Sequence, residues 1–447
     1  MELLDKLVLP VSGGHLNLLR YLLVLAVTMY LAYSSLLFAA LITSINYSFK
    51  KSTEESNFQR LTKDIIDLIT SAPLIWFALG IAPFVAIILI YTQLLHNLES
   101  SVVAYFTFSF FFYCAAIASV YYFKQSIYIS SVSKLVGDES IKESKLGDFF
   151  ENNGMVKSSS RLFGALFLTV SIWLFMGATS SAISPETWSQ SIFDSMFNML
   201  TTFKLLAFVS FSFLLLGMTF VFSNYYWSDN KVNDNANVYE IFAKKQMSNL
   251  ALSSIIFVPI FYALSIVYVP KSSISFNMFL FGVLALIFVL IGVHFVYVAV
   301  KENSAKYIAT GFWLVILSLL FMTAQDQTAF SVSTESNVLL MASEYDKIHL
   351  EKAGAGNVVE INAEEIYKNR CSACHKFDVK QVTAPAYNEV LPKYIGNEQE
   401  MIKFILNPYP VNKQDYPAGM ASQGLKPNEA KAIVEYLLSE VKKNTVK

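Results

Sequence analysis

Charged residues are scarce in this chain: they make up 15% of its 447 residues, whereas soluble proteins carry about 25%. This shortage and a hydrophobic share of 54% exclude a soluble globular enzyme and a disordered chain. Three cysteines and 17 glycines are too few for a disulfide scaffold or a collagen. The 33 basic residues do not exceed the 34 acidic ones, so no surplus of positive charge is present to bind nucleic acid. Most of the chain is therefore expected to lie in lipid.

Long apolar runs are abundant. Runs of about 20 apolar residues are long enough to cross a bilayer as helices. The sequence contains eight, near 19–46, 72–95, 101–123, 162–184, 195–225, 248–269, 276–300 and 307–325. The first run is too long for a signal peptide and lacks a small-residue cleavage site. We therefore expect it to be retained as the first of eight spans.

The lysines and arginines between these runs are unevenly distributed. Fifteen follow the first, third, fifth and seventh runs, and the alternate connections hold only Lys271. Because positively charged loops stay on the cytoplasmic side, both the N-terminus and the region after the eighth run are predicted to lie outside. The localisation expected is the bacterial inner membrane, with a C-terminal domain in the periplasm.

The composition becomes polar after the eighth run. The predicted fold class is all-α: a polytopic membrane helix bundle of about eight spans over 1–325, a periplasmic linker over 326–360 and a small α-helical domain over 361–447. The linker contains Gly354 and Gly356, and one short helix is expected in it near 345–351.

The C-terminal domain contains the motif Cys371-Ser372-Ala373-Cys374-His375, which is the pattern of covalent haem c attachment. Two thiols three residues apart on one helical turn reach both vinyl groups of a porphyrin, and the next residue, His375, then lies beneath the iron. The alternatives are a redox Cys-x-x-Cys pair or half of a zinc site. No second cysteine pair is present to complete zinc ligation.

This motif and its surroundings resemble the class I cytochrome c family over the last 85 or so residues. A helix over 363–370 leads into the motif, and a closing helix over 427–441 carries an apolar stripe. The stripe is Ala430, Ile433, Val434, Leu437 and Leu438, at helical spacing. Tyr436 is expected to flank the haem as an aromatic side chain.

The resemblance also implies the remaining ligands of one covalent haem c. A methionine on the loop before the closing helix usually supplies the sixth iron ligand, and Met420 stands in that place. Met401 competes with it but lies among the apolar residues of a predicted helix over 398–406. Pro385 resembles the family's proline whose carbonyl orients the iron-bound imidazole. A His375/Met420 haem is expected to transfer electrons rather than bind gases.

Polar residues at membrane depth suggest further sites, because burying them in lipid is costly. His15 and His96 are predicted at the outer face, where they either ligate a haem b between them or contact water and headgroups. Lys204 needs a partner: Asp194, a carboxylate of another chain or a haem propionate, unless its span begins later than predicted. Further polar or thiol residues of interest are Gln93, Asn198, His294 and Cys114, the last interpreted as a small buried apolar residue.

The outer N-terminus, the histidine ahead of the first span and the many helices weakly resemble cytochrome bd oxidase subunit I and its relatives. The chain lacks their quinol-loop pattern and a pair of membrane glutamates.

We expect an electron-transfer subunit of an oxidoreductase complex, whose partners are other integral membrane subunits and a soluble periplasmic electron carrier. The alternative is the catalytic subunit of a bd-like or quinol-oxidising enzyme with haem b. A receptor or transporter with a haem sensor has only the helix count in its favour.

Overall fold

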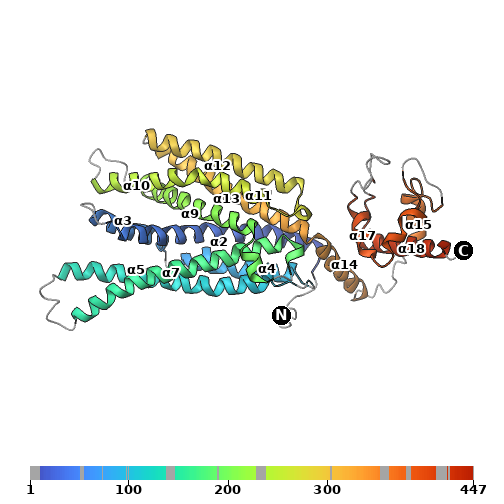
Figure 1. The fold of residues 1–447 in the computed structure, drawn as a ribbon, viewed down its shortest axis with the longest axis horizontal. Helices are drawn as coiled ribbons and strands as arrows, with labels where there is room; N and C mark the ends of the chain where they lie inside the picture. Colours follow the sequence, from blue (N-terminus) through green and yellow to red (C-terminus); the bar gives the residue numbers. More distant parts are fainter. Residues whose placement is uncertain are drawn as a thin grey trace. The chain divides into compact units, whose positions relative to one another are not determined.

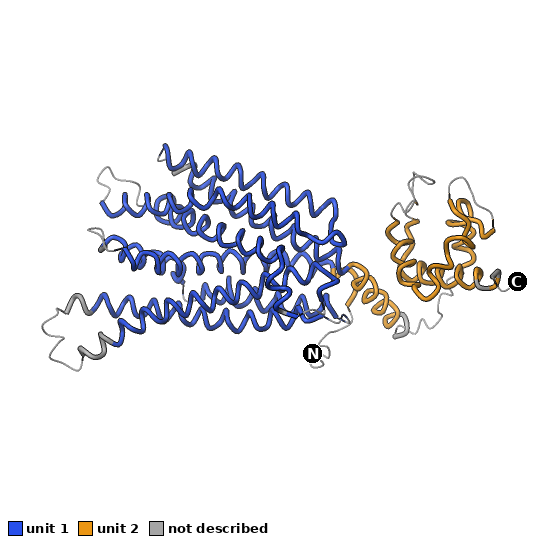
Figure 2. Tube along the Cα trace, in the orientation of Figure 1, with its two compact units in different colours: residues 1–8, 17–334 blue, residues 9–16, 335–447 orange. Residues whose placement is uncertain are grey.

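The computed structural model of the chain describes residues 11–50, 55–72, 74–96, 98, 100–136, 146–188, 191–227, 238–302, 305–352, 362–378, 384–408, 420 and 423–445. Over these residues the chain is helical and contains no strand, which confirms the predicted all-α class. Parts of the predicted linker and of the loop before Met420 lie outside the described residues. The chain divides into two compact units, residues 1–8 with 17–334 and residues 9–16 with 335–447 (Figure 2).

The first unit is a bundle of long helices (Figure 1). Its helices are α2 (Gly13–Ser48), α3 (Glu55–Ile69), α4 (Ala82–Leu94, preceded by the π-helical turn Phe77–Ile81), α5 (Val102–Val136), α7 (Leu146–Ala182), α8 (Ile192–Met196), α9 (Met199–Phe222, followed by the π-helical turn Ser223–Trp227), α10 (Val238–Ile255), α11 (Phe257–Val267), α12 (Phe276–Glu302) and α13 (Ala305–Ser333). Short 3₁₀ turns form at Pro185–Thr187 and Lys271–Ser273.

Eight helical segments among the described residues are long and apolar enough to cross a membrane: Gly13–Ser48, Phe77–Leu94, Val102–Val132, Asn152–Ala182, Met199–Tyr226, Val238–Val267, Phe276–Glu302 and Tyr307–Ser333. Each overlaps one of the eight predicted spans. A helix satisfies all of its interior backbone hydrogen bonds within itself, which an apolar segment in lipid requires. The eight helices are compatible with a multi-pass membrane protein.

Helices α5 and α7 extend further than hydropathy predicts, and they pack against each other as an antiparallel pair (Figure 1). Near this extension the Ser126 hydroxyl donates to Asn153 Oδ1 at 2.6 Å, and Asn153 Nδ2 donates to Ser130 Oγ at 3.0 Å. Asn153 is buried between the two helices. Polar contacts of this kind between two helices leave no signal in a hydropathy average, so the predicted fourth span begins too late.

Helix α3 was not predicted. Its apolar residues Phe58, Leu61, Ile65, Ile66 and Ile69 are all buried, and their spacing of three and four residues defines one face of an amphipathic helix. The predicted eighth span also ended early, because α13 continues through Ser333 and includes Asp326.

The second unit contains α14 (Glu335–Lys352), α15 (Ala363–Ile366, continued by the π-helical turn Tyr367–Cys371), α16 (Tyr387–Val390), a 3₁₀ turn at Pro392–Tyr394, α17 (Glu398–Leu406) and α18 (Pro427–Thr445). The closing helix α18 packs against α15 and α17. The five residues of its predicted stripe are at most 4% exposed, which confirms the expected packing face. Met401 is buried in the same core, as predicted for a core residue.

Candidate functional site

The Cys-x-x-Cys-His segment directly follows α15. The Asn362 side chain caps this helix by accepting a hydrogen bond from the backbone N–H of Glu365 at 3.1 Å, which is favourable at a helix N-terminus. The helix then widens into the π-helical turn that ends at Cys371, where the sequence predicted a plain helix. The backbone N–H of His375 donates to the carbonyl oxygen of Cys371 at 2.9 Å. This turn holds the motif in a compact loop.

The two cysteines of the motif differ in their surroundings. Cys371 is 8% exposed and belongs to the domain core, whereas Cys374 is exposed, and neither forms a disulfide. Burial raises the pKa of the Cys371 thiol. The two thiols therefore lie three residues apart at the edge of an apolar core, and neither is used in a disulfide.

His375 is oriented by a backbone carbonyl. Its Nδ1 lies 3.1 Å from the carbonyl oxygen of Pro385. Because a carbonyl oxygen only accepts hydrogen bonds, Nδ1 carries the hydrogen, and the neutral ring keeps its lone pair on Nε2. Burial lowers the pKa of His375, an effect that the Pro385 hydrogen bond opposes. The structure thus gives Pro385 the contact that its predicted role requires, and it leaves Nε2 as the nitrogen for a metal.

Tyr387 contributes to the site although the sequence analysis did not select it. Its ring stacks on that of His375 with centroids 4.7 Å apart and planes 3° from parallel. Tyr387 is buried in the same core as Cys371, and this burial raises its pKa. Its position two residues after Pro385 was the only signal that could have identified it. The stacked ring holds the imidazole plane in place.

Met420 is half-buried and packs against the domain core, as does Tyr436. The centroid of Tyr436 lies 6.1 Å from that of Tyr367 in the π-helical turn before Cys371. Met420 and Tyr436 therefore both lie against the core that contains Cys371. The Met420 thioether thus lies at the apolar surface of this core.

Arg370, the residue before Cys371, reaches the segment that follows Met420. Its guanidinium donates to the carbonyl oxygens of Gln423 at 2.8 Å and Gly424 at 3.3 Å. Gly424 has a φ of +60°, a left-handed conformation that glycine adopts without strain. Arg370 therefore links the Cys-x-x-Cys-His segment to the segment that carries Met420.

These residues fit a covalently attached haem. They supply two thiols at the required spacing, an oriented neutral imidazole nitrogen, a thioether and an apolar surround. Among the described residues, no group of three or more His, Cys, Asp and Glu side chains lies close enough to hold a metal ion by itself. The zinc alternative therefore gains no support.

Lys204 has a partner inside the helix bundle. Its Nζ lies 2.6 Å from Asp326 Oδ2, and the two side chains are 9% and 18% exposed. Asp194, one of the partners considered from the sequence, is exposed in α8. The predicted linker began at 326, but residues 326–333 belong to α13, which places Asp326 in a helix. Helix α9 begins at Met199, four residues later than the predicted span, so Lys204 lies in the second turn of α9.

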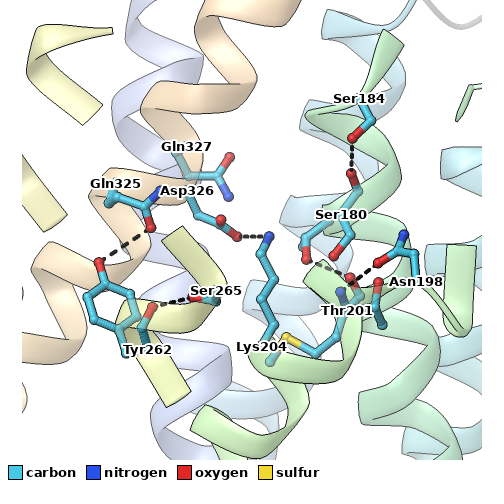
Figure 3. Close-up of polar contacts among 12 residues, drawn as sticks. Ser180, Ser184, Asn198, Thr201, Lys204, Tyr262, Ser265, Gln325, Asp326 and Gln327 are labelled. Atoms are coloured by element: carbon cyan, nitrogen blue, oxygen red, sulfur yellow. Dashed lines mark hydrogen bonds and ion pairs between the residues drawn. The ribbon is translucent and has the colours of Figure 1, made fainter. Parts of the chain in front are cut away.

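The residues around this ion pair are also polar (Figure 3). The side-chain oxygens of Gln325 and Gln327 accept hydrogen bonds from the hydroxyls of Tyr262 at 3.3 Å and Tyr91 at 3.2 Å. Asn198 caps α9 by accepting from the backbone N–H of Thr201 at 2.7 Å. Three helices, α4, α11 and α13, thus contribute amides and phenols next to the charge of α9.

The remaining candidates lie on several different helices. His15 is exposed in the first turn of α2, whereas His96 is half-buried in the turn after α4. The two histidines belong to different compact units. His294 is exposed on α12, Cys114 is half-buried in α5 and Gln93 is half-buried in α4.

Comparison with known families assigns the C-terminal region. The model of the Cytochrome c family matches residues 361–440, which include the Cys-x-x-Cys-His segment, Pro385, Met420 and Tyr436. A comparison with curated proteins gave no match. The resemblance of the membrane part to cytochrome bd oxidase subunit I gains no support. Residues 361–440 are a class I cytochrome c domain, which implies a covalently bound haem c and makes the chain an electron-transfer protein.

Proposed function

We propose that the chain is a membrane-anchored monohaem c-type cytochrome and a subunit of a respiratory electron-transfer complex. The observation that carries the proposal is the contact between His375 Nδ1 and the Pro385 carbonyl, within a Cys-x-x-Cys-His segment that lies inside the Cytochrome c match. An imidazole oriented in this way by a backbone acceptor is the usual arrangement for a metal-binding histidine.

Each site residue has a defined part in this function. Cys371 and Cys374 would form the thioether bonds, and His375 Nε2 and Met420 Sδ would be the two iron ligands. When bound, the haem would supply one-electron redox chemistry. Tyr387 stacks on the imidazole and Pro385 fixes its tautomer, while Tyr436 shields the edge of the site. A thioether ligand raises the reduction potential, which suits electron transfer rather than oxygen chemistry.

The distribution of basic residues supports a periplasmic position for the domain. The connections after the first, third, fifth and seventh spans contain fifteen lysines and arginines, and the alternate connections contain one. By the positive-inside rule the domain is outside, in the periplasm of a bacterium with its bundle in the inner membrane. A soluble periplasmic carrier could then exchange electrons with it.

The size of the bundle supports association with other membrane subunits. One helix suffices to tether a cytochrome, and this chain has eight candidate spans. His294 is exposed on α12 beside the exposed residues Leu290, Ile291 and Tyr297. A polar side chain facing outward at membrane depth is costly in lipid and is stabilised by a polar partner. A helix of another integral subunit would supply one.

A pyridine haemochrome spectrum of the detergent-purified chain, with haem quantified per polypeptide, tests the proposal. We expect one c-type haem and no b-type haem. A chain without haem c would overturn the proposal. One c-type haem together with b-type haem would instead favour the alternative, a bd-like or quinol-oxidising catalytic subunit with His15 and His96 as candidate ligands.

A further inference from the structure

The Lys204–Asp326 pair lies below the surface of the helix bundle. Helix α9 begins at Met199 and α13 ends at Ser333. At 1.5 Å per residue, Lys204 is about 8 Å from the start of its helix, and Asp326 is about 10 Å from the end of its helix. Charged side chains at such depth in a membrane helix are costly and generally serve a function.

Three buried side chains of the bundle carry hydrogen-bond donors that have no acceptor among the described residues. Gln325 is 3% exposed, and its Nε2 is buried without a partner among the described residues. The hydroxyls of Ser180 and Ser195 are also buried and, within the part of the chain that the structure describes, unpaired. An ammonium has three N–H groups, and the bond from Lys204 to Asp326 uses one of them.

Unpaired buried donors indicate a missing acceptor, because such groups are normally satisfied in folded proteins. In the view of Figure 3, Asp326 and Tyr262 lie on one side of Lys204, and Thr201 and Ser180 lie on the other side. The site therefore offers N–H and O–H donors together with one carboxylate. Since Lys204 and Asp326 neutralise each other, it suits a neutral ligand that carries acceptor oxygens and a dissociable hydroxyl.

We propose that the Lys204–Asp326 site binds the head group of a membrane quinol and that this quinol is the electron donor of the chain. A quinol dissolves in the bilayer, its two oxygens match the donors and its hydroxyls match the carboxylate. This inference rests on the proposed electron-transfer function, and it names the chemical class of the electron donor.

The chemistry balances with groups already named. A quinol loses two electrons and two protons to become a quinone, and both of its O–H bonds break. The Asp326 carboxylate accepts the proton of the hydroxyl that faces it and releases it to water, and the proton of the opposite hydroxyl passes to water directly. The two electrons would pass one at a time to the haem that Cys371, Cys374, His375 and Met420 would hold, and the electron acceptor of the chain would take up the first before the second is transferred. Lys204 and Gln325 donate hydrogen bonds to the quinone oxygens.

The competing explanation is that the pair only ties α9 to α13. Replacing a buried ion pair by apolar side chains of similar volume is often tolerated. The double variant Lys204→Met with Asp326→Leu therefore separates the two explanations. If the pair is only structural, this variant folds and keeps every activity. If it is the quinol site, the variant folds but loses its reaction with quinol.

The experiment uses the full detergent-purified chain. Its haem c is oxidised and then reduced either by decylubiquinol or by ascorbate, and the reduction is followed by absorbance. In the double variant we expect reduction by the quinol to slow about tenfold or more, since several hydrogen bonds to the head group are lost, with no change for ascorbate. The matched control is Lys124→Met with Asp67→Leu, which removes the Lys124–Asp67 pair at 4.0 Å and is expected to leave both rates unchanged.

A photoreactive azidoquinone gives a readout that does not depend on the haem. We expect it to label peptides from 199–206 and 322–328 in the wild-type chain and to lose this labelling in the double variant. If quinol reduced the haem of the double variant at the wild-type rate, or if the azidoquinone labelled only other peptides, the proposed quinol site would be overturned. Absence of haem c would overturn the proposed function instead, and the labelling would still test the site.

Discussion

The cytochrome domain and the membrane bundle assemble their polar sites in different ways. In the domain, one continuous stretch from Arg370 to Tyr387 supplies both thiols, the imidazole, its orienting carbonyl and the stacked ring. In the bundle, Lys204 and Asp326 are 122 residues apart, and their neighbours come from two further helices. A local site depends on a few covalently linked turns, whereas a remote one exists only when four helices are correctly packed. Single substitutions should therefore affect mainly chemistry in the first region, and folding as well as ligand binding in the second.

The largest effect is expected from Cys374→Ala. Removing one thiol eliminates a thioether bond, and haem attachment should be severely impaired while the bundle stays folded. The measurement is haem staining after denaturing electrophoresis, with the yield of membrane-inserted chain as the reference. Cys114→Ala is the control, because that half-buried thiol in α5 has no part in attachment. Full staining of Cys374→Ala would show that the motif is wrongly assigned.

In the bundle, single substitutions of the ion pair should be more harmful than the double one. Lys204→Met alone leaves the Asp326 carboxylate buried without its counter-charge, which costs about 3–5 kcal/mol of stability. Thermal unfolding in detergent should show Lys204→Met below wild type, and Lys204→Met with Asp326→Leu closer to wild type. A double variant that is less stable than the single one would mean that the two side chains do not act as a pair.

The contrast between local and remote sites also decides what could be predicted from the sequence. The Cys371–His375 motif predicted the haem domain because spacing within one turn is fixed by the chain itself, and the same holds for the stripe on α18. The eight spans were predicted because length and apolarity suffice for a membrane helix.

The polar contacts between helices had no comparable signal in the sequence. Asp326 follows the apolar part of α13, so its carboxylate ended the predicted span instead of marking a partner for Lys204. Helix α3 was missed for a related reason: its charged residues lower the mean hydropathy, although its apolar face is fully buried. Tyr387 was not predicted because its role depends on the orientation of the His375 ring. That orientation is set by the hydrogen bond to the Pro385 carbonyl, which the sequence does not reveal.

In the domain, Met420→Ala should leave the haem attached but change its electronic properties. Losing the thioether opens a coordination position and lowers the reduction potential, within the range of about 0.8 V that axial ligands span. Redox titration and carbon monoxide binding to the ferrous form measure the two effects. Met401→Ala is the control, because Met401 is buried in the core: it should lower stability and leave the potential unchanged. An unaltered spectrum and potential in Met420→Ala would exclude Met420 as the ligand.

The smallest effect is expected from Arg370→Ala. Its two hydrogen bonds to the carbonyls of Gln423 and Gly424 are exposed, so their loss should cost about 1 kcal/mol. If these bonds restrain the segment that carries Met420, this loss makes dissociation of the methionine from the iron about fivefold more frequent. Carbon monoxide should then bind ferrous haem faster by the same factor.

Arg370→Lys should restore little, because an ammonium cannot present the guanidinium fork to two carbonyls at once. Lys368→Ala is the matched control, since Lys368 pairs only with Glu364 in an exposed contact. Equal rates in Arg370→Ala and wild type would show that the Met420 segment is held by its own packing on the core.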